Sequence, residues 1–188
     1  MYNAIAIGGI ILFAALLGLA ATKPGTFRVQ RTKRIQAPPE TVFALINDFR
    51  SWAVWSPYEK LDPTMTRTHS GSPNGKGAVY RWAGKGKAGE GRMEITDISP
   101  PSRVTIKLDF LKPFEGHNIA EFTLESDGDG TNVTWALHGP QSYFVKVMTI
   151  FVSMDRLIGG DFETGLSNMK AVAERHSGEH EPVSRGIS

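Results

Sequence analysis

The sequence predicts an α+β domain in which an antiparallel sheet is covered on one face by a C-terminal helix. Between residues 65 and 138, apolar and polar residues alternate in short runs separated by Gly, Pro and Asp. Segment 161–175 instead has the apolar spacing of one helix face, with Phe162, Leu166, Met169 and Ala173. A sheet with one apolar face needs a covering layer, and this helix can provide it.

A strand and two short helices are predicted to come first in the domain. Residues 26–36 indicate a strand, although Arg31 and Lys33 interrupt its apolar face. Residues 37–40 are expected to start a helix, because proline is tolerated in a first turn and an acidic residue favours the positive N-terminus. Residues 49–57 indicate a second short helix or turn.

The remaining strands are expected to form a meander. In 103–111, residues Val104, Ile106, Leu108 and Phe110 alternate with polar residues. The Asp-Gly-Asp-Gly sequence at 127–130 is typical of a hairpin turn. One apolar and one polar face per strand indicates an antiparallel sheet covered on one side. The predicted ranges are 65–69, 78–83, 92–98, 103–111, 117–126 and 131–138.

After the sheet, Gly159-Gly160 is expected to separate an amphipathic piece, 142–154, from the longer helix 161–175. The very apolar stretch 143–154 is predicted to belong to the core. The alternative is an exposed patch beside a cavity mouth that touches a bilayer. Residues 177–188 are polar and aperiodic, which predicts a disordered tail.

The N-terminal segment 4–21 contains no charged residue and is long enough to span a bilayer. It is predicted to be a single-pass anchor, which with its linker occupies residues 1–25 ahead of a folded domain at 26–176. The alternative is export after cleavage of a signal peptide, although the first three residues lack the usual basic side chain. Basic residues follow the segment, so the positive-inside rule predicts a cytoplasmic domain.

Composition and motifs argue against several classes of protein. A net charge of +2 in 188 residues is too small to indicate a nucleic-acid partner, and the absence of cysteine excludes disulfides and Cys-based metal sites. The sequence has no H-E-x-x-H motif, and we predict no catalytic residue, metal or cofactor. Residues 84–89 match G-x-G-x-x-G, but a strand pattern follows them, which indicates a hairpin loop.

The stretch from Ala37 to Pro63, APPETVFALINDFRSWAVWSPYEKLDP, resembles the opening of the polyketide cyclase/dehydrase-like branch of the START/Bet v 1 (SRPBCC) superfamily. The likeness continues through GKG at 75–77, YRW at 80–82 and GEG at 89–91, and it covers about residues 26–176. The resemblance implies a helix-grip fold, a seven-stranded antiparallel sheet around a C-terminal helix with a cavity between. Members bind or transport lipids, sterols, quinones and polyketides, and a minority are enzymes.

Aromatic residues are the candidate ligand contacts. The resemblance implies that Trp52 and Trp55 form the mouth of the cavity, and that other rings face its interior. The alternative is that these rings simply fill the core. His138, at a strand end, is the candidate polar group of the cavity. The complete predicted set of cavity-lining aromatic residues is Trp52, Trp55, Tyr80, Trp82, Phe110, Trp135 and Phe162.

These observations lead to the hypothesis of a membrane-anchored domain that binds or transports a hydrophobic ligand. The first alternative is a polyketide cyclase- or dehydratase-like enzyme, which an inward-facing His138, Glu94 or Asp109 would favour. Glu94 and Asp109 are expected to face solvent. The second alternative is a protein-interaction module, which a collapsed pocket with Trp135 touching Phe162 would favour.

Overall fold

The computed structural model describes residues 2–178, and the surroundings of side chains from residue 5 to residue 175. Within this part of the chain, seven strands form one antiparallel sheet in the order β1-β7-β6-β5-β4-β3-β2. Only β1 reaches its neighbour through a long connection in sequence, since the other strands follow one another as a meander. The strands are β1 Thr26–Ile35, β2 Thr66–Gly71, β3 Ala78–Ala83, β4 Glu90–Ser99, β5 Arg103–Lys112, β6 Gly116–Asp127 and β7 Gly130–Pro140.

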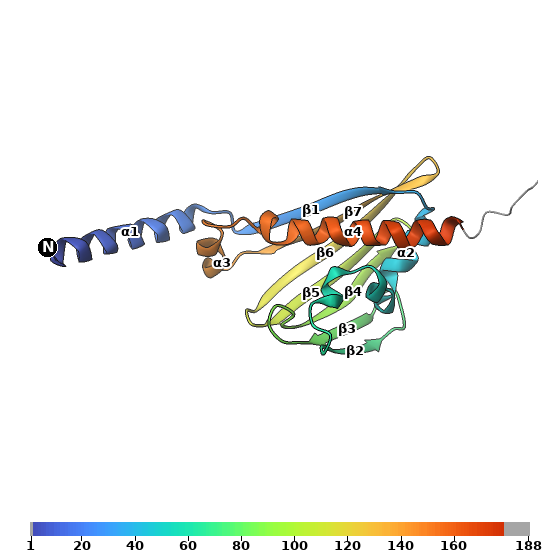
Figure 1. Cartoon of the computed structure of the whole chain (residues 1–188), viewed down its shortest axis with the longest axis horizontal. Helices are drawn as coiled ribbons and strands as arrows, with labels where there is room; N and C mark the ends of the chain where they lie inside the picture. The colour runs from blue at the N-terminus through green and yellow to red at the C-terminus, as the bar shows by residue number, and fades with distance from the viewer. Residues whose placement is uncertain (1, 179–188) are drawn as a thin grey trace, which may run out of the picture.

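The helices confirm the predicted α+β helix-grip architecture. In Figure 1, α4 runs along one face of the sheet. The helix α1 projects away from the domain on the side opposite the C-terminal end of α4. The short helices after β1 lie over the same face as α4. The helical elements are α1 Tyr2–Thr22, α2 Pro39–Asn47, η1 Phe49–Val54, η2 Pro57–Lys60, α3 Tyr143–Met148 and α4 Met154–Gly178.

The two basic residues that interrupt the apolar face of β1 meet the polar side of α4. The Arg31 guanidinium forms ion pairs with Asp155 and Glu163, each at 2.7 Å. The Lys33 ammonium donates a hydrogen bond to Ser167 Oγ at 2.8 Å. Because β1 is an edge strand, its inward face lies at the border of the core, where charged side chains can join the sheet to the helix.

The predicted helix break at Gly159-Gly160 is wrong, because α4 begins at Met154 and passes through both glycines. Glycine in a helix interior costs about 1 kcal/mol relative to alanine. Here it permits close packing, since a Cβ on Gly159 would lie 2.2 Å from Nη2 of Arg31. The glycine therefore makes room for the Arg31 ion pairs.

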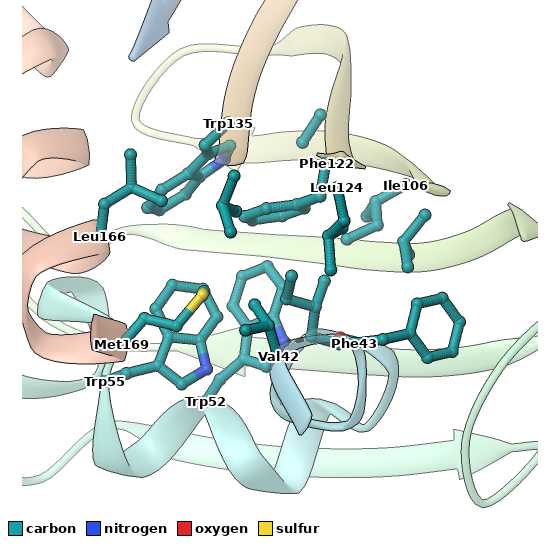
Figure 2. Packing of buried hydrophobic residues seen from close by; sticks show 14 of the residues in the cluster. Val42, Phe43, Trp52, Trp55, Ile106, Phe122, Leu124, Trp135, Leu166 and Met169 are labelled. Carbon is teal, nitrogen blue, oxygen red and sulfur yellow. Dashed lines mark hydrogen bonds between the residues drawn. The ribbon is translucent and has the colours of Figure 1, made fainter. Parts of the chain in front are cut away.

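The hydrophobic core lies between the sheet, α2, η1 and α4 (Figure 2). Trp52 and Trp55 pack side by side, with ring centroids 4.8 Å apart. Their indole N–H groups donate to the carbonyls of Ile46 and Leu45, at 3.0 and 2.9 Å. These carbonyls belong to the last turn of α2, which has no further turn to bond them. The two tryptophans therefore fix η1 to the end of α2.

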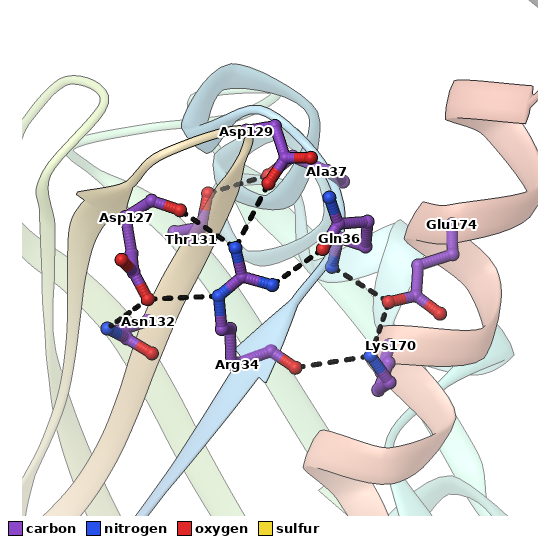
Figure 3. A network of polar contacts seen from close by, with 9 residues as sticks. All are labelled: Arg34, Gln36, Ala37, Asp127, Asp129, Thr131, Asn132, Lys170 and Glu174. Atoms are coloured by element: carbon purple, nitrogen blue, oxygen red, sulfur yellow. Dashed lines mark hydrogen bonds and ion pairs between the residues drawn. The ribbon is translucent and has the colours of Figure 1, made fainter.

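A polar network ties the β6–β7 hairpin to β1 and α4 (Figure 3). The Arg34 guanidinium donates to Asp127 Oδ2 at 2.9 Å and to Asp129 Oδ1 at 3.0 Å. The Arg34 carbonyl accepts from Lys170 Nζ at 3.3 Å, and Lys170 also pairs with Glu174. The network holds the tip of the hairpin, predicted from the Asp-Gly repeat, against the C-terminal half of α4.

The prediction that 143–154 belongs to the core is wrong. Phe144 is 53% exposed and Phe151 is 67% exposed. α3 packs instead against the end of α1, where the Tyr143 hydroxyl donates to the Leu17 carbonyl at 2.6 Å. The inner face of the sheet is already covered by α4, α2 and η1, so α3 has no sheet face left to cover.

Ser177 and Gly178, the first residues of the predicted disordered tail, continue α4. The rest of that predicted tail, residues 179–188, lies outside the described residues.

Candidate functional site

A cavity of about 310 Å³ lies between the sheet and α4. Its walls come from η1, η2, the inward faces of β3 to β7 and the first turns of α4. Apolar side chains dominate, and a few polar groups reach the lining. The lining residues are Trp52, Ser56, Tyr58, Glu59, Leu61, Met65, Tyr80, Trp82, Lys87, Ala88, Met93, Leu108, Phe110, Ala120, Trp135, Leu137, Ile158, Asp161 and Phe162.

The structure brings most of the predicted aromatic set together around this cavity. Trp55 is the exception, because it is fully buried among Trp52, Phe122 and Trp135 and does not line the cavity. Whether the lining rings contact a ligand stays a prediction. The predicted residues that line the cavity are Trp52, Tyr80, Trp82, Phe110, Trp135 and Phe162.

Trp135 and Phe162 touch across the space between sheet and helix. Their rings are stacked with centroids 4.1 Å apart and planes 5° apart. Gly165 makes room for this contact, since a Cβ there would lie 2.7 Å from Cζ3 of Trp135. The stacked pair closes one side of the space between sheet and helix, and the cavity of about 310 Å³ remains beside it.

A hydrogen-bonded polar cluster, which the sequence did not indicate, reaches the cavity from η2 and β3. The Tyr80 hydroxyl donates to Glu59 Oε1 at 2.6 Å, and Arg67 pairs with Glu59 Oε2 at 2.6 Å. Burial, followed by the hydrogen bond to Glu59, raises the pKa of Tyr80 above its ordinary value. Tyr80 therefore stays a protonated phenol at neutral pH. No motif marks this cluster, because η2 meets β2 and β3 only in the folded chain.

Ser56 is the second polar group that the sequence did not indicate. It directly follows Trp55, lines the cavity and is only 1% exposed. Its Oγ atom has no hydrogen-bond partner among the described residues. A buried hydroxyl without a partner costs about 1–3 kcal/mol. The wall of the cavity therefore includes a buried hydroxyl whose hydrogen-bonding capacity the described residues do not use.

None of the candidate acid/base groups lines the cavity. His138 and Glu94 lie on the outer face of the sheet, as strand alternation requires once Leu137 and Met93 face inward. The sequence predicted His138 as a polar group of the cavity. His138 follows the inward-facing Leu137, so its side chain points to the opposite face of the sheet. The prediction for Glu94 gave the correct face.

Asp109 also lies on the outer face, but the expectation that it meets solvent is wrong, since it is 7% exposed. His117, its cross-strand neighbour on β6, contacts it at 2.7 Å, and Lys107 pairs with it at 3.2 Å. Burial raises the pKa of Asp109, but the hydrogen bonds from His117 and Lys107 outweigh it and lower the pKa overall. Asp109 is therefore part of a structural ion cluster.

The G-x-G-x-x-G match forms the turn between β3 and β4, as predicted. Gly86 and Gly89 have positive φ angles of 59° and 58°, which glycine adopts readily. The Trp82 indole donates to the carbonyl of Ala88 at 2.9 Å. A Cβ on Gly91 would lie 2.3 Å from that indole. The glycines therefore let Trp82 lie flat against β4 as part of the cavity wall.

Comparison with solved structures finds proteins that have the same fold. Protein CV1439 from Chromobacterium violaceum is 16% identical, with a TM-score of 0.55, over 81% of this chain and 99% of that chain. The protein TTHA0849 from Thermus thermophilus is 19% identical, with a TM-score of 0.57, over 80% of this chain and 99% of that chain. At these identities the matches show a shared fold.

The di-domain ARO/CYC protein BexL, from the BE-7585A biosynthetic pathway, is 17% identical with a TM-score of 0.59. The match covers 92% of this chain and 59% of BexL. No curated protein matches the sequence. The family described as polyketide cyclase / dehydrase and lipid transport matches residues 26–174, which is most of the chain. The chain therefore belongs to this family, which confirms the predicted family resemblance.

Proposed function

We propose that this protein binds a hydrophobic small molecule, lipid-like or polyketide-like, in the cavity between the sheet and α4. The observation that carries the proposal is the cavity itself, about 310 Å³ of space with walls of aromatic and aliphatic side chains. Small-molecule sites are typically apolar cavities with a few placed polar groups. The family description, which includes lipid transport, supports the same class of ligand.

The proposal includes anchoring of the domain to a membrane by α1. The segment Ile5–Thr22 is apolar along its whole length, and only 6% of its residues are buried. A single apolar helix near the N-terminus is also typical of cleaved signal sequences. Its packing against α3 favours a retained helix. A poorly soluble ligand partitions into the bilayer, so a tethered cavity meets it at a high effective concentration.

A catalytic role is the second candidate, and the Glu59–Tyr80 cluster is the observation that bears on it. A catalytic base would need a free, accessible proton acceptor. Both carboxylate oxygens of Glu59 already accept hydrogen bonds, from Tyr80 and Arg67. The raised pKa of Tyr80 keeps its proton in place at neutral pH. The cluster is therefore arranged to hold the wall and present hydrogen-bonding groups, which favours binding.

Native mass spectrometry of the full chain, purified from its host in detergent and followed by extraction, tests the binding proposal. We expect a stoichiometric adduct with a lipid-like or quinone-like mass. An empty protein that also fails to take up 1-anilinonaphthalene-8-sulfonate would contradict the proposal. That result would favour an interaction module, in which the Trp135–Phe162 contact is part of a filled core.

Substitution of Ser56 tests whether the cavity recognises a polar group on its ligand. We expect Ser56→Ala to weaken binding of 2-naphthol by about two- to tenfold, because a neutral hydrogen bond contributes about 0.5–1.5 kcal/mol. Binding of naphthalene, which lacks the hydroxyl, should not weaken. Fluorescence titration of both compounds measures the difference.

Ser51→Ala is the matched control for this substitution, since Ser51 lies in η1 outside the cavity lining. Equal losses for 2-naphthol and naphthalene in Ser56→Ala would show that Ser56 acts only through the packing of the wall.

A further inference from the structure

We infer that this protein has a second membrane-contacting surface, at which the end of the domain contacts the lipid interface beside α1. This docking surface consists of α3, the turn that follows it, the end of β5 and the loop between β5 and β6. Its large apolar side chains are each about half exposed or more. The inference rests on the proposed anchoring by α1. The docking surface comprises Leu111, Phe114, Tyr143, Phe144, Met148 and Phe151.

The two parts of the docking surface touch each other although they lie far apart in sequence. The rings of Phe114 and Phe144 have centroids 5.3 Å apart. Figure 1 shows α3 at the end of the domain from which α1 departs. Contiguous apolar surface of this kind is uncommon on a soluble monomer and marks a contact with protein, ligand or membrane.

Contacts with α1 identify lipid as the material that covers the docking surface. The Tyr143 hydroxyl donates to the Leu17 carbonyl at 2.6 Å, and Lys23 Nζ donates to the Thr149 carbonyl at 3.4 Å. Leu17 lies near the C-terminal end of the candidate span Ile5–Thr22. A helix of this length barely crosses the hydrocarbon layer, so its ends lie at the interface. α3 is held to that end and therefore lies at the depth of the headgroups.

The side chains of the docking surface have the composition of an interfacial segment. The surface combines aromatic side chains with two lysines: Lys146 belongs to α3, and the Lys23 ammonium reaches the Thr149 carbonyl after it. Their ammonium groups can meet anionic headgroups. Lys112, at the end of β5, pairs with Glu90 at 2.9 Å, and Glu115, in the loop that follows, lies 3.3 Å from His117. Among the residues that the structure describes, Lys23 and Lys146 have no acidic partner, so the unpaired charge beside the surface is basic and lies on the α3 side.

The docking surface and the cavity wall draw on neighbouring residues of the sequence, although no residue of the docking surface lines the cavity. Phe110 lines the cavity, and the next residue of β5, Leu111, is 50% exposed on the docking surface. On α4, Ile158 lines the cavity beside the 52% exposed Leu157. Successive side chains of a strand point to opposite faces, so these sequence neighbours do not define an entry route for a ligand.

Single-cysteine labelling of the full chain tests the inference, and the absence of native cysteine makes each label unique. Phe114→Cys and Phe144→Cys receive an environment-sensitive NBD fluorophore on the docking surface. Ile10→Cys reports on insertion of α1. Val54→Cys, at a 56% exposed apolar residue of η1, is the matched control. The proteins are reconstituted in phosphatidylcholine/phosphatidylglycerol vesicles with and without nitroxide-labelled acyl chains.

We expect blue-shifted emission and nitroxide quenching at positions 10, 114 and 144, and neither at position 54. Quenching at position 10 alone would overturn the docking surface and leave the anchor intact. No quenching at position 10 would overturn the anchor and the docking argument that depends on it, while cavity binding is still judged by mass spectrometry. A blue shift at position 144 without quenching would mean that protein, such as a second copy of the chain, covers the surface, and would overturn the lipid assignment.

Discussion

Trp55→Ala is expected to lower the free energy of unfolding by about 3–5 kcal/mol, the usual cost of removing a large buried aromatic side chain. Trp55 is fully buried, with its ring centroid 6.1 Å from that of Phe122 and 5.6 Å from that of Trp135. The substitution also leaves the Leu45 carbonyl without the indole N–H that bonds it. The loss therefore combines a core void with an unpaired carbonyl at the end of α2.

Chemical denaturation of the full chain in detergent, followed by far-ultraviolet circular dichroism, measures this loss. Val54→Ala is the neighbouring control, because an exposed side chain contributes little and its removal should change stability by less than about 0.5 kcal/mol. If Trp55→Ala cost no more than the control, the space around Trp55 would have to refill by rearrangement, and the described packing of η1 against α2 would be incorrect.

Ala120→Leu is expected to weaken binding of a hydrophobic probe by about tenfold or more, equivalent to about 1.4 kcal/mol. Ala120 faces the cavity from β6, between Ile106 on β5 and Leu137 on β7. The added carbon atoms would occupy part of the space of about 310 Å³ that the ligand needs. Because they extend into a cavity, their cost to stability should be at the low end of the range of about 1–3 kcal/mol for overpacking.

Titration with 1-anilinonaphthalene-8-sulfonate, alongside a thermal unfolding curve, separates lost binding from lost folding. Thr123→Leu is the matched control, because it adds a leucine to the same strand on the outer face of the sheet. Unchanged probe affinity in a folded Ala120→Leu protein, with the control also unchanged, would show that the probe binds outside the cavity. The binding proposal would then lose its main support.

The strands were predictable because their signal is local. In β5, Val104, Ile106 and Leu108 alternate with polar residues, and the structure places these three in the core. The turn at 127–130 is also determined by its own residues, since Asp-Gly pairs favour tight hairpins. The family resemblance added the helix-grip topology and the position of most aromatic residues around the cavity.

The errors concern residues whose surroundings depend on distant segments. The stretch 143–154 is apolar enough for a core, but it lies beyond the end of the sheet and beside α1. Gly159 resembles a helix breaker until Arg31 is seen to occupy the space that a side chain would need. Asp109 is buried because His117 and Lys107 flank it on neighbouring positions of the sheet.

The sequence by itself determined an antiparallel sheet, a covering C-terminal helix and an apolar N-terminal helix, because periodicity and composition act within each segment. Only the tertiary structure decided which apolar surfaces stay exposed and which polar groups reach the cavity. Glu59 reaches it because η2 folds over β2 and β3, a long-range contact that no local pattern encodes. Whether a side chain is buried depends on every element that packs around it, so burial is determined by the whole fold and not by a local pattern.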